Sequence, residues 1–173
     1  MSIVRAAFGH YDAVGNPDEA DVIIGHSFGT RTGEGSPNRS IAEFTIVHSD
    51  GRPILADRTL VNAFPNRDEQ VDHVVEGPTS NIVGQGVGAW GTLVEAKKFM
   101  NQEGLGNALM VGHAYHIGRI LMQAKKLGIR SIVPANLPRD FDPESEQLWT
   151  RWPSMWVPRE VIGSLVLRLQ GKL

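Results

Sequence analysis

Two short apolar segments of this chain end in the same way, with a glycine followed by a histidine. The first is Val22-Ile23-Ile24-Gly25-His26, and the second is Leu109-Met110-Val111-Gly112-His113. Runs of this length and composition predict buried strands of a parallel sheet. Ligands of open parallel sheets bind outside the carboxyl ends of the strands. If these two strands are neighbours, His26 and His113 lie across that crevice from one another, which predicts the position of a site.

The rest of the chain alternates between strand-like and helix-like segments. The second of these strands is placed at residues 108–111, and further strands are predicted at residues 53–56, 73–76 and 129–133. Helices are predicted from a Ser40 cap to Asp50, from 87 to 103 and from 117 to 127, followed by a last apolar segment at 161–169. This alternation predicts an α/β protein, a Rossmann-like three-layer sandwich with a mainly parallel central sheet. A chain of 173 residues without a linker or repeat predicts a single domain over 1–173.

Composition narrows the classes of partner. The formal net charge of −2 gives no electrostatic case for binding nucleic acid, which needs a basic face. The absence of cysteine excludes disulfides, thiolate catalysis and cysteine-zinc sites. The N-terminus lacks the apolar core of a signal peptide, and no window reaches the length of a transmembrane helix. We therefore expect a soluble, cytoplasmic protein with a small-molecule ligand and neither a nucleic-acid nor a membrane partner.

The segment that follows the second strand carries the best candidates for chemistry. His113 and His116 are candidate acid–base groups, because histidine titrates near neutral pH. Arg119 lies three residues further on, where a guanidinium can hold a phosphate or carboxylate, although an ion pair with Glu76 is an alternative. Another interpretation is that one of the histidines only forms hydrogen bonds within the fold. With His26 and Glu76 the histidines could hold a metal, but no further ligand cluster supports a metal site.

Two glycine motifs suggest functions that their surroundings do not support. Gly25-His26-Ser27-Phe28-Gly29 matches the G-x-S-x-G elbow of serine hydrolases, but a long glycine-rich loop follows instead of a helix. Ser27 is therefore expected to donate one hydrogen bond to a ligand, and a hydrolase is the weaker alternative. Residues 86–91 match G-x-G-x-x-G, but no acidic residue ends the next strand, which favours a small-residue helix face packed on the sheet. Arg39 flanks the first loop, either as an anion contact or as a solvated side chain.

Several segments resemble a known family. Glu76-Gly77-Pro78-Thr79-Ser80-Asn81 resembles the E-x-x-S/T-x-N stretch of the YdcF/SanA/ElyC-like proteins. Tyr115-His116-Ile117-Gly118-Arg119 is similar to their Y/F-H-x-x-R motif. The segment from Trp156 to Leu173, with its acidic Glu160, is similar to the tail of the family. The resemblance covers most of the chain and places it with the soluble branch.

The resemblance implies a Rossmann-like fold and a pocket that gathers the first loop, Glu76, Asn81, His116 and Arg119. It also implies an adenosine-type ligand such as S-adenosylmethionine or a related nucleotide. His26 and His113 depart from the family pattern, which has glycines at the first position and a small polar residue at the second. These added histidines favour a specialised enzyme.

Taken together, the residues predict an enzyme that acts on a nucleotide-like or otherwise anionic small molecule at the carboxyl ends of the strands. In this hypothesis His113 or His116 moves a proton, and Glu76 orients a histidine or the ligand. The candidate catalytic residues are His26, Glu76, His113 and His116. The candidate ligand-binding residues are Gly25, Ser27, Arg39, Thr79, Asn81 and Arg119. The alternative function is a module that binds an adenosine-type ligand without catalysis.

Overall fold

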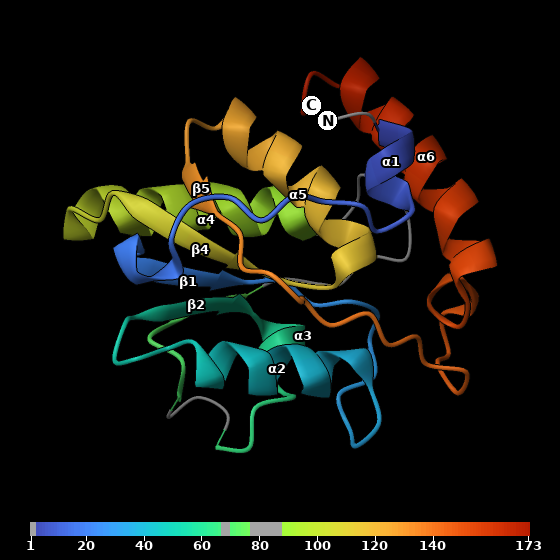
Figure 1. Ribbon diagram of the computed structural model, residues 1–173, viewed down its shortest axis with the longest axis horizontal. Coiled ribbons are helices and arrows are strands. Elements are labelled where there is room, and N and C mark those ends of the chain that lie inside the picture. The colour runs from blue at the N-terminus through green and yellow to red at the C-terminus, as the bar shows by residue number, and fades with distance from the viewer. Residues whose placement is uncertain (1–2, 67–69, 77–87) are drawn as a thin grey trace.

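The protein is built on one five-stranded sheet whose neighbouring strands all run parallel, in the order β3-β2-β1-β4-β5 (Figure 1). The computed structural model describes residues 3–66, 70–76 and 88–173. The strands are β1 Val22–Gly25, β2 Ile54–Asp57, β3 His73–Val75, β4 Asn107–Val111 and β5 Arg130–Ile132. All five lie where the alternation of apolar runs predicts them, to within two residues at each end.

The helices cover both faces of this sheet and make it a three-layer sandwich. They are α1 Ile3–Ala7, α2 Pro37–Val47, α3 Arg58–Val61, α4 Gly88–Glu103, α5 Ala114–Lys126 and α6 Pro153–Leu169, with short 3-10 helices η1 Pro17–Glu19 and η3 Leu148–Thr150. Figure 1 shows α2 and α3 on one face and α4 and α5 on the other. From β1 to β3 the chain adds strands toward one edge of the sheet, and after β3 it returns and adds β4 and β5 toward the other edge. Because each crossover helix makes a right-handed connection, the helices after β3 lie on the opposite face. The predicted Rossmann-like α/β class is confirmed.

The strand order reverses between β1 and β4, and this is where the sheet is most completely buried. Every residue of β1 is buried, as are the last four residues of β4. Ile23, Ile24, Leu109 and Met110 are fully buried in the core, as expected for central strands covered on both faces. At the end of β1, a Cβ on Gly25 would lie 2.7 Å from Cδ2 of Leu60. A larger residue at position 25 would therefore force the buried Leu60 side chain of α3 to move.

Two helix boundaries differ from the sequence-based expectation. Helix α2 begins at Pro37, and its cap is Ser36, whose Oγ accepts a hydrogen bond from the Arg39 amide at 3.2 Å. The predicted Ser40 cap is wrong, because proline at the first helical position already provides the start. Helix α6 begins at Pro153, so the apolar segment 161–169 is only its second half. Pro158 lies inside this helix, near its beginning, and the two prolines concealed the helical pattern.

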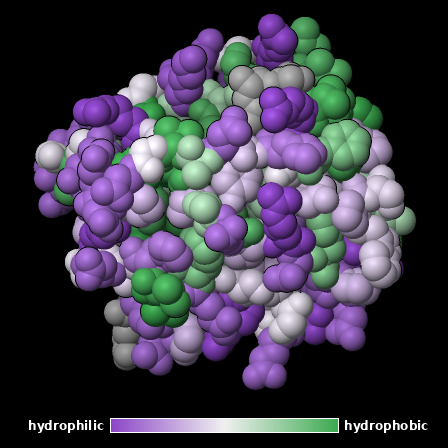
Figure 2. Space-filling view, viewed as in Figure 1, coloured by the Kyte–Doolittle hydropathy of each residue, from purple (hydrophilic) through white to green (hydrophobic). Residues whose placement is uncertain are grey.

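Exposed apolar side chains are concentrated on one part of the surface. Figure 2 shows apolar side chains gathered over the region of α1 and α6, on a face that is otherwise largely polar. Exposed apolar side chains of this region are Val4, Phe8, Ile162, Leu165 and Leu169. In the described part of the chain, no helix combines the length and apolar character that a membrane span requires.

Candidate functional site

The candidate site lies at the carboxyl ends of β1 and β4, the point where the strand order reverses. The two strands pair in register, with Gly25 opposite Val111, and the His26 amide donates a hydrogen bond to the Val111 carbonyl at 2.9 Å. The two strands that end in glycine and histidine are therefore neighbours, which is the condition under which the sequence placed a site here. Gly112 packs beside His26, since a Cβ there would lie 3.5 Å from the His26 Cβ. In doubly wound proteins this position is where ligands bind.

His26 is a buried histidine whose ring forms no hydrogen bond with the part of the chain that the structure describes. Only 1% of the residue is exposed, and neither Nδ1 nor Nε2 has a hydrogen-bond partner among the described residues. Burial, and then the charges of His116 and Arg119, lower the pKa of His26 to about 3. The imidazole is therefore neutral at physiological pH, with one N–H donor and one lone pair that no described side chain satisfies.

His116 and Arg119, one turn apart on α5, meet Glu160 of α6. Nε of Arg119 donates to Oε1 of Glu160 at 2.7 Å, and the same oxygen lies 3.4 Å from Nδ1 of His116. Nη2 of Arg119 lies 3.1 Å from Nδ1 and 3.4 Å from Nε2 of the histidine. An atom that close to both ring nitrogens cannot lie in the ring plane without overlapping Cε1, so the guanidinium covers one face of the imidazole.

This stacking determines the hydrogen-bonding state of His116. With the guanidinium over the ring face, the Glu160 carboxylate is the partner of Nδ1, which carries the proton and leaves a lone pair on Nε2. Burial, and then the Arg119 charge, lower the pKa of His116, while Glu160 acts in the opposite direction. Burial alone would raise the pKa of Glu160, but Arg119, His116 and their hydrogen bonds lower it to about 2. Glu160 is therefore a carboxylate beside a neutral histidine.

A second guanidinium makes the site electropositive. The Arg159 side chain lies over Trp149, 4.6 Å from the ring centroid, and 5.5 Å from the Trp156 centroid. Its pKa is lowered by burial and then by the charge of Arg119, which indicates that the two cations are close neighbours. Arginine stays protonated in proteins, so two guanidiniums face one carboxylate in this cluster. The net positive charge favours an anionic ligand.

His113 has a different environment from His116. It is the cap of α5: its Nδ1 accepts a hydrogen bond from the Tyr115 amide at 3.3 Å, and its Nε2 lies 3.0 Å from the Asp140 carbonyl. The ring stacks on Phe28 with centroids 3.7 Å apart. Burial lowers the pKa of His113 to about 3, against the effect of the Asp140 carbonyl. Hydrogen bonding within the fold accounts for both ring nitrogens of His113, as one interpretation of the sequence anticipated.

The loop after β1 is held in place by two polar side chains, those of Asp57 and the buried Asn38. The Ser27 amide donates to Oδ2 of Asp57 at 2.9 Å, and the same carboxylate caps α3 through the Leu60 amide at 3.1 Å. Burial raises the pKa of Asp57, against those hydrogen bonds. Oδ1 of Asn38 accepts from the Phe28 amide at 2.7 Å. Residues 26–36 are loop before α2 begins, so Ser27 is not followed by the helix that a hydrolase elbow requires.

Glu76 and Arg39, two other predicted site residues, pair with side chains outside this cluster. Glu76 follows the edge strand β3 and pairs with Arg58. The alternative ion pair between Arg119 and Glu76 is wrong, because Arg119 pairs with Glu160. Nε of Arg39 donates to Glu43 at 2.7 Å, and its Nη1 donates to the Ala63 carbonyl at 3.3 Å. Thr79 and Asn81 lie outside the described residues. So do residues 86 and 87, the first two of the G-x-G-x-x-G segment.

Glu160 and Arg159 are the members of the cluster that motif spacing did not identify. Glu160 is 41 residues beyond Arg119, and only its place in the family-like tail drew attention to it. Among the described residues, no group of three or more histidine, aspartate and glutamate side chains is arranged to hold a metal ion.

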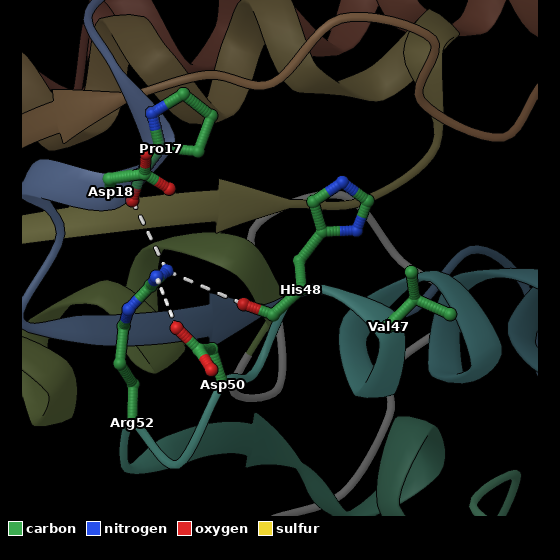
Figure 3. Close-up of a pocket in the computed structure, with 6 residues that line it drawn as sticks. All are labelled: Pro17, Asp18, Val47, His48, Asp50 and Arg52. Atoms are coloured by element: carbon green, nitrogen blue, oxygen red, sulfur yellow. Dashed lines mark hydrogen bonds and ion pairs between the residues drawn. The ribbon is translucent and has the colours of Figure 1, made fainter.

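A pocket of about 310 Å³ lies at the other end of the sheet, near the amino ends of β1 and β2 (Figure 3). Figure 3 shows the guanidinium of Arg52 between its partners, where Nη1 donates to the carbonyls of Pro17 at 3.1 Å and His48 at 3.4 Å. Asp50 lies 3.7 Å from Nη2 of the same guanidinium. This pocket lies at the end of the sheet opposite to the cluster around His116 and shares no residue with it.

Comparison with protein-family models, with curated proteins and with solved structures finds no match for this chain. The geometry of the site is therefore the basis on which a function is inferred.

Proposed function

We propose that this protein is an enzyme that acts on a small anionic molecule, with His116 as its proton-transfer group. The observation that carries the proposal is the meeting of His116, Arg119 and Glu160 on the two helices α5 and α6. Helix α5 follows β4, whose end pairs with the end of β1 at the point where doubly wound sheets bind ligands. The contact between His116 and Arg119 also supports membership of the YdcF-like family, whose Y/F-H-x-x-R motif these two residues match.

The anion-binding part of the proposal depends on Arg119. Its Nε and Nη2 contact Glu160 and His116, whereas Nη1 has no hydrogen bond to any residue that the structure describes. The side chain is 15% exposed, so a ligand can reach it. A charge-assisted hydrogen bond from Nη1 to a carboxylate or phosphate oxygen would satisfy the remaining donor. Arg159 adds a second positive charge to the site.

The proton-transfer part depends on His116 and Glu160. The lowered pKa of His116 keeps its Nε2 lone pair free at neutral pH, the state that a general base requires. When Nε2 takes a proton, the ring becomes an imidazolium, and the carboxylate beside Nδ1 stabilises that charge. Glu160 thus has the position of the acidic residue that orients a catalytic histidine. Burial of both groups strengthens this interaction.

The second candidate is a module that binds an adenosine-type ligand without catalysis. It is favoured by the low pKa values of His26 and His113, which keep two of the site's histidines neutral throughout the physiological range. Asp57 ends the second strand, where dinucleotide-binding proteins carry the acid that binds ribose. Both of its oxygens already accept backbone hydrogen bonds, so we rank this candidate second.

The test is a depletion experiment with the purified full chain. Wild type and the variants His116→Gln and Arg119→Lys are incubated with a mixture of small carboxylic acids, phosphate esters and nucleotides, and each compound is followed by mass spectrometry. His48→Gln is the control, since His48 lies at the opposite end of the sheet (Figure 3). We expect one anionic compound to be consumed by wild type and by the control, but not by His116→Gln.

The other outcomes are equally informative. A compound that binds without being consumed, and that Arg119→Lys no longer binds, would support the binding module. Equal consumption by His116→Gln would exclude His116 as the proton-transfer group. No binding and no consumption across the three classes would overturn the proposal.

A further inference from the structure

The two buried ring nitrogens of His26 indicate which chemical groups the ligand contains. Buried polar side chains in folded proteins are almost always hydrogen-bonded, so unpartnered ones mark a place where another molecule completes the site. Both nitrogens of the His26 ring are buried and unpartnered among the described residues. The backbone of His26 is held by the hydrogen bond from its amide to the Val111 carbonyl, and Gly112 packs beside its Cβ. The residue is 1% exposed, so the ring is enclosed by the protein.

We propose that His26 contacts the ligand directly and recognises a hydroxyl or amide group that lies close to the anionic group held by Arg119. This inference rests on the proposed function, and it specifies the substrate class as a small acid that carries a neighbouring donor–acceptor group.

The reason is the pattern of donors and acceptors. A neutral imidazole presents one N–H and one lone pair, and both must be satisfied. An anion accepts from the N–H but leaves the lone pair unpaired, and an ammonium group does the reverse. A hydroxyl or an amide can do both. Burial opposes protonation of His26 most strongly, and the charge of Arg119, with any positive charge on His116, adds to this effect, so the neutral ring keeps this mixed pattern.

The experiment compares matched ligands with and without a hydroxyl. Binding of glycolate and acetate, and of glycerol 3-phosphate and propyl phosphate, is measured by calorimetry on the full chain. In wild type we expect the hydroxylated member of at least one pair to bind about tenfold more tightly, the size of effect that a buried hydrogen bond gives. In His26→Phe that preference falls to about one, because the phenyl ring has no polar atoms, whereas the hydroxyl-free member still binds.

Two further variants make the result specific. His26→Gln keeps a donor and an acceptor and is expected to retain part of the preference. His48→Phe, at the far end of the sheet, is expected to behave as wild type. If His26→Phe fails to fold, the ring ¹⁵N signals of His26 in the wild type give the same test, since they should move more with glycolate or glycerol 3-phosphate than with the matched ligand.

The inference and the proposed function fail differently. If wild type binds the anions but shows no preference in either pair, a buried water pairs with His26; the inference is then overturned and the proposed function stands. The same holds if His26→Phe keeps the full preference. If no anion of either pair binds to wild type, the proposed function is overturned, and this inference with it.

Discussion

Acidification is expected to lower the free energy of unfolding, because His26 and His113 remain neutral in the folded protein. Both have a folded-state pKa of about 3, whereas an unfolded histidine titrates near about 6.5. As the pH falls below about 6.5, the unfolded chain takes up protons that the folded chain does not, which favours unfolding. Stability present at neutral pH is therefore lost progressively as the pH falls from about 6.5 toward about 3.

The magnitude follows from these pKa values. Each unit of pH below the unfolded pKa costs about 1.4 kcal/mol for each histidine. At about pH 5 the loss is about 2 kcal/mol for each and about 4 kcal/mol for the two together. That is a large part of the roughly 5–15 kcal/mol that stabilises a typical domain. His26 and His113 are both essentially inaccessible to solvent, so screening by water does not reduce the effect.

The assay is urea unfolding of wild type, His26→Phe and the control His48→Phe at about pH 7, 6 and 5. Because other titrating groups contribute equally to all three proteins, the difference between variants isolates His26. We expect His26→Phe to lose about 2 kcal/mol less than wild type between about pH 7 and pH 5. If His26→Phe loses as much as wild type, His26 is not a buried neutral histidine, and the reasoning is refuted.

Three substitutions test the packing around the site, each by urea unfolding. Glu160→Gln should cost about 3 kcal/mol, since it leaves a buried guanidinium without its carboxylate; a cost near zero would show that the ion pair is not formed. Gly25→Ala should cost about 1–3 kcal/mol, because its methyl would lie 2.7 Å from the Leu60 side chain, whereas Gly33→Ala, with nothing within 4 Å, should change stability by less than about 0.5 kcal/mol. Asn38→Ala should cost about 2 kcal/mol and speed proteolysis within residues 26–36, since its side chain bonds three backbone groups of that loop; unchanged proteolysis would contradict its anchoring role.

The pattern of apolar residues along the chain predicted the central strands of the sheet correctly. Apolar runs such as Val22–Gly25 and Asn107–Val111 are too short for buried helices and are flanked by turn residues, so they could be recognised as central strands. The four-residue helix α3 is too short to show a period, and α6 contains two prolines, so neither was apparent. The start of α2 was misplaced because Ser36-Pro37 and Ser40 both offer capping patterns, and only the Ser36 hydroxyl meets a free amide.

The site was predicted in part, for a similar reason. The ends of neighbouring parallel strands meet by geometry, so the strand-end position of His26 could be deduced from sequence. His116 and Arg119 were both identified as candidates on one helix, but their contact with each other was not predicted. Glu160 could not be assigned as their partner, because it arrives from a helix whose path depends on the whole fold. Glu76 was expected in the site, but it follows an edge strand, two strands away from β1.

The most direct test of the central claim is a ¹⁵N spectrum of the histidine rings, recorded while the full chain is titrated with inorganic phosphate. If His26, His116 and Arg119 form one anion-binding site, the ring signals of His26 and His116 should move together along a single saturable curve. Those of His48 should stay in place, and Arg119→Gln should abolish the response. If the His26 and His116 signals do not move, or if they move equally in Arg119→Gln, the residues do not form the site described.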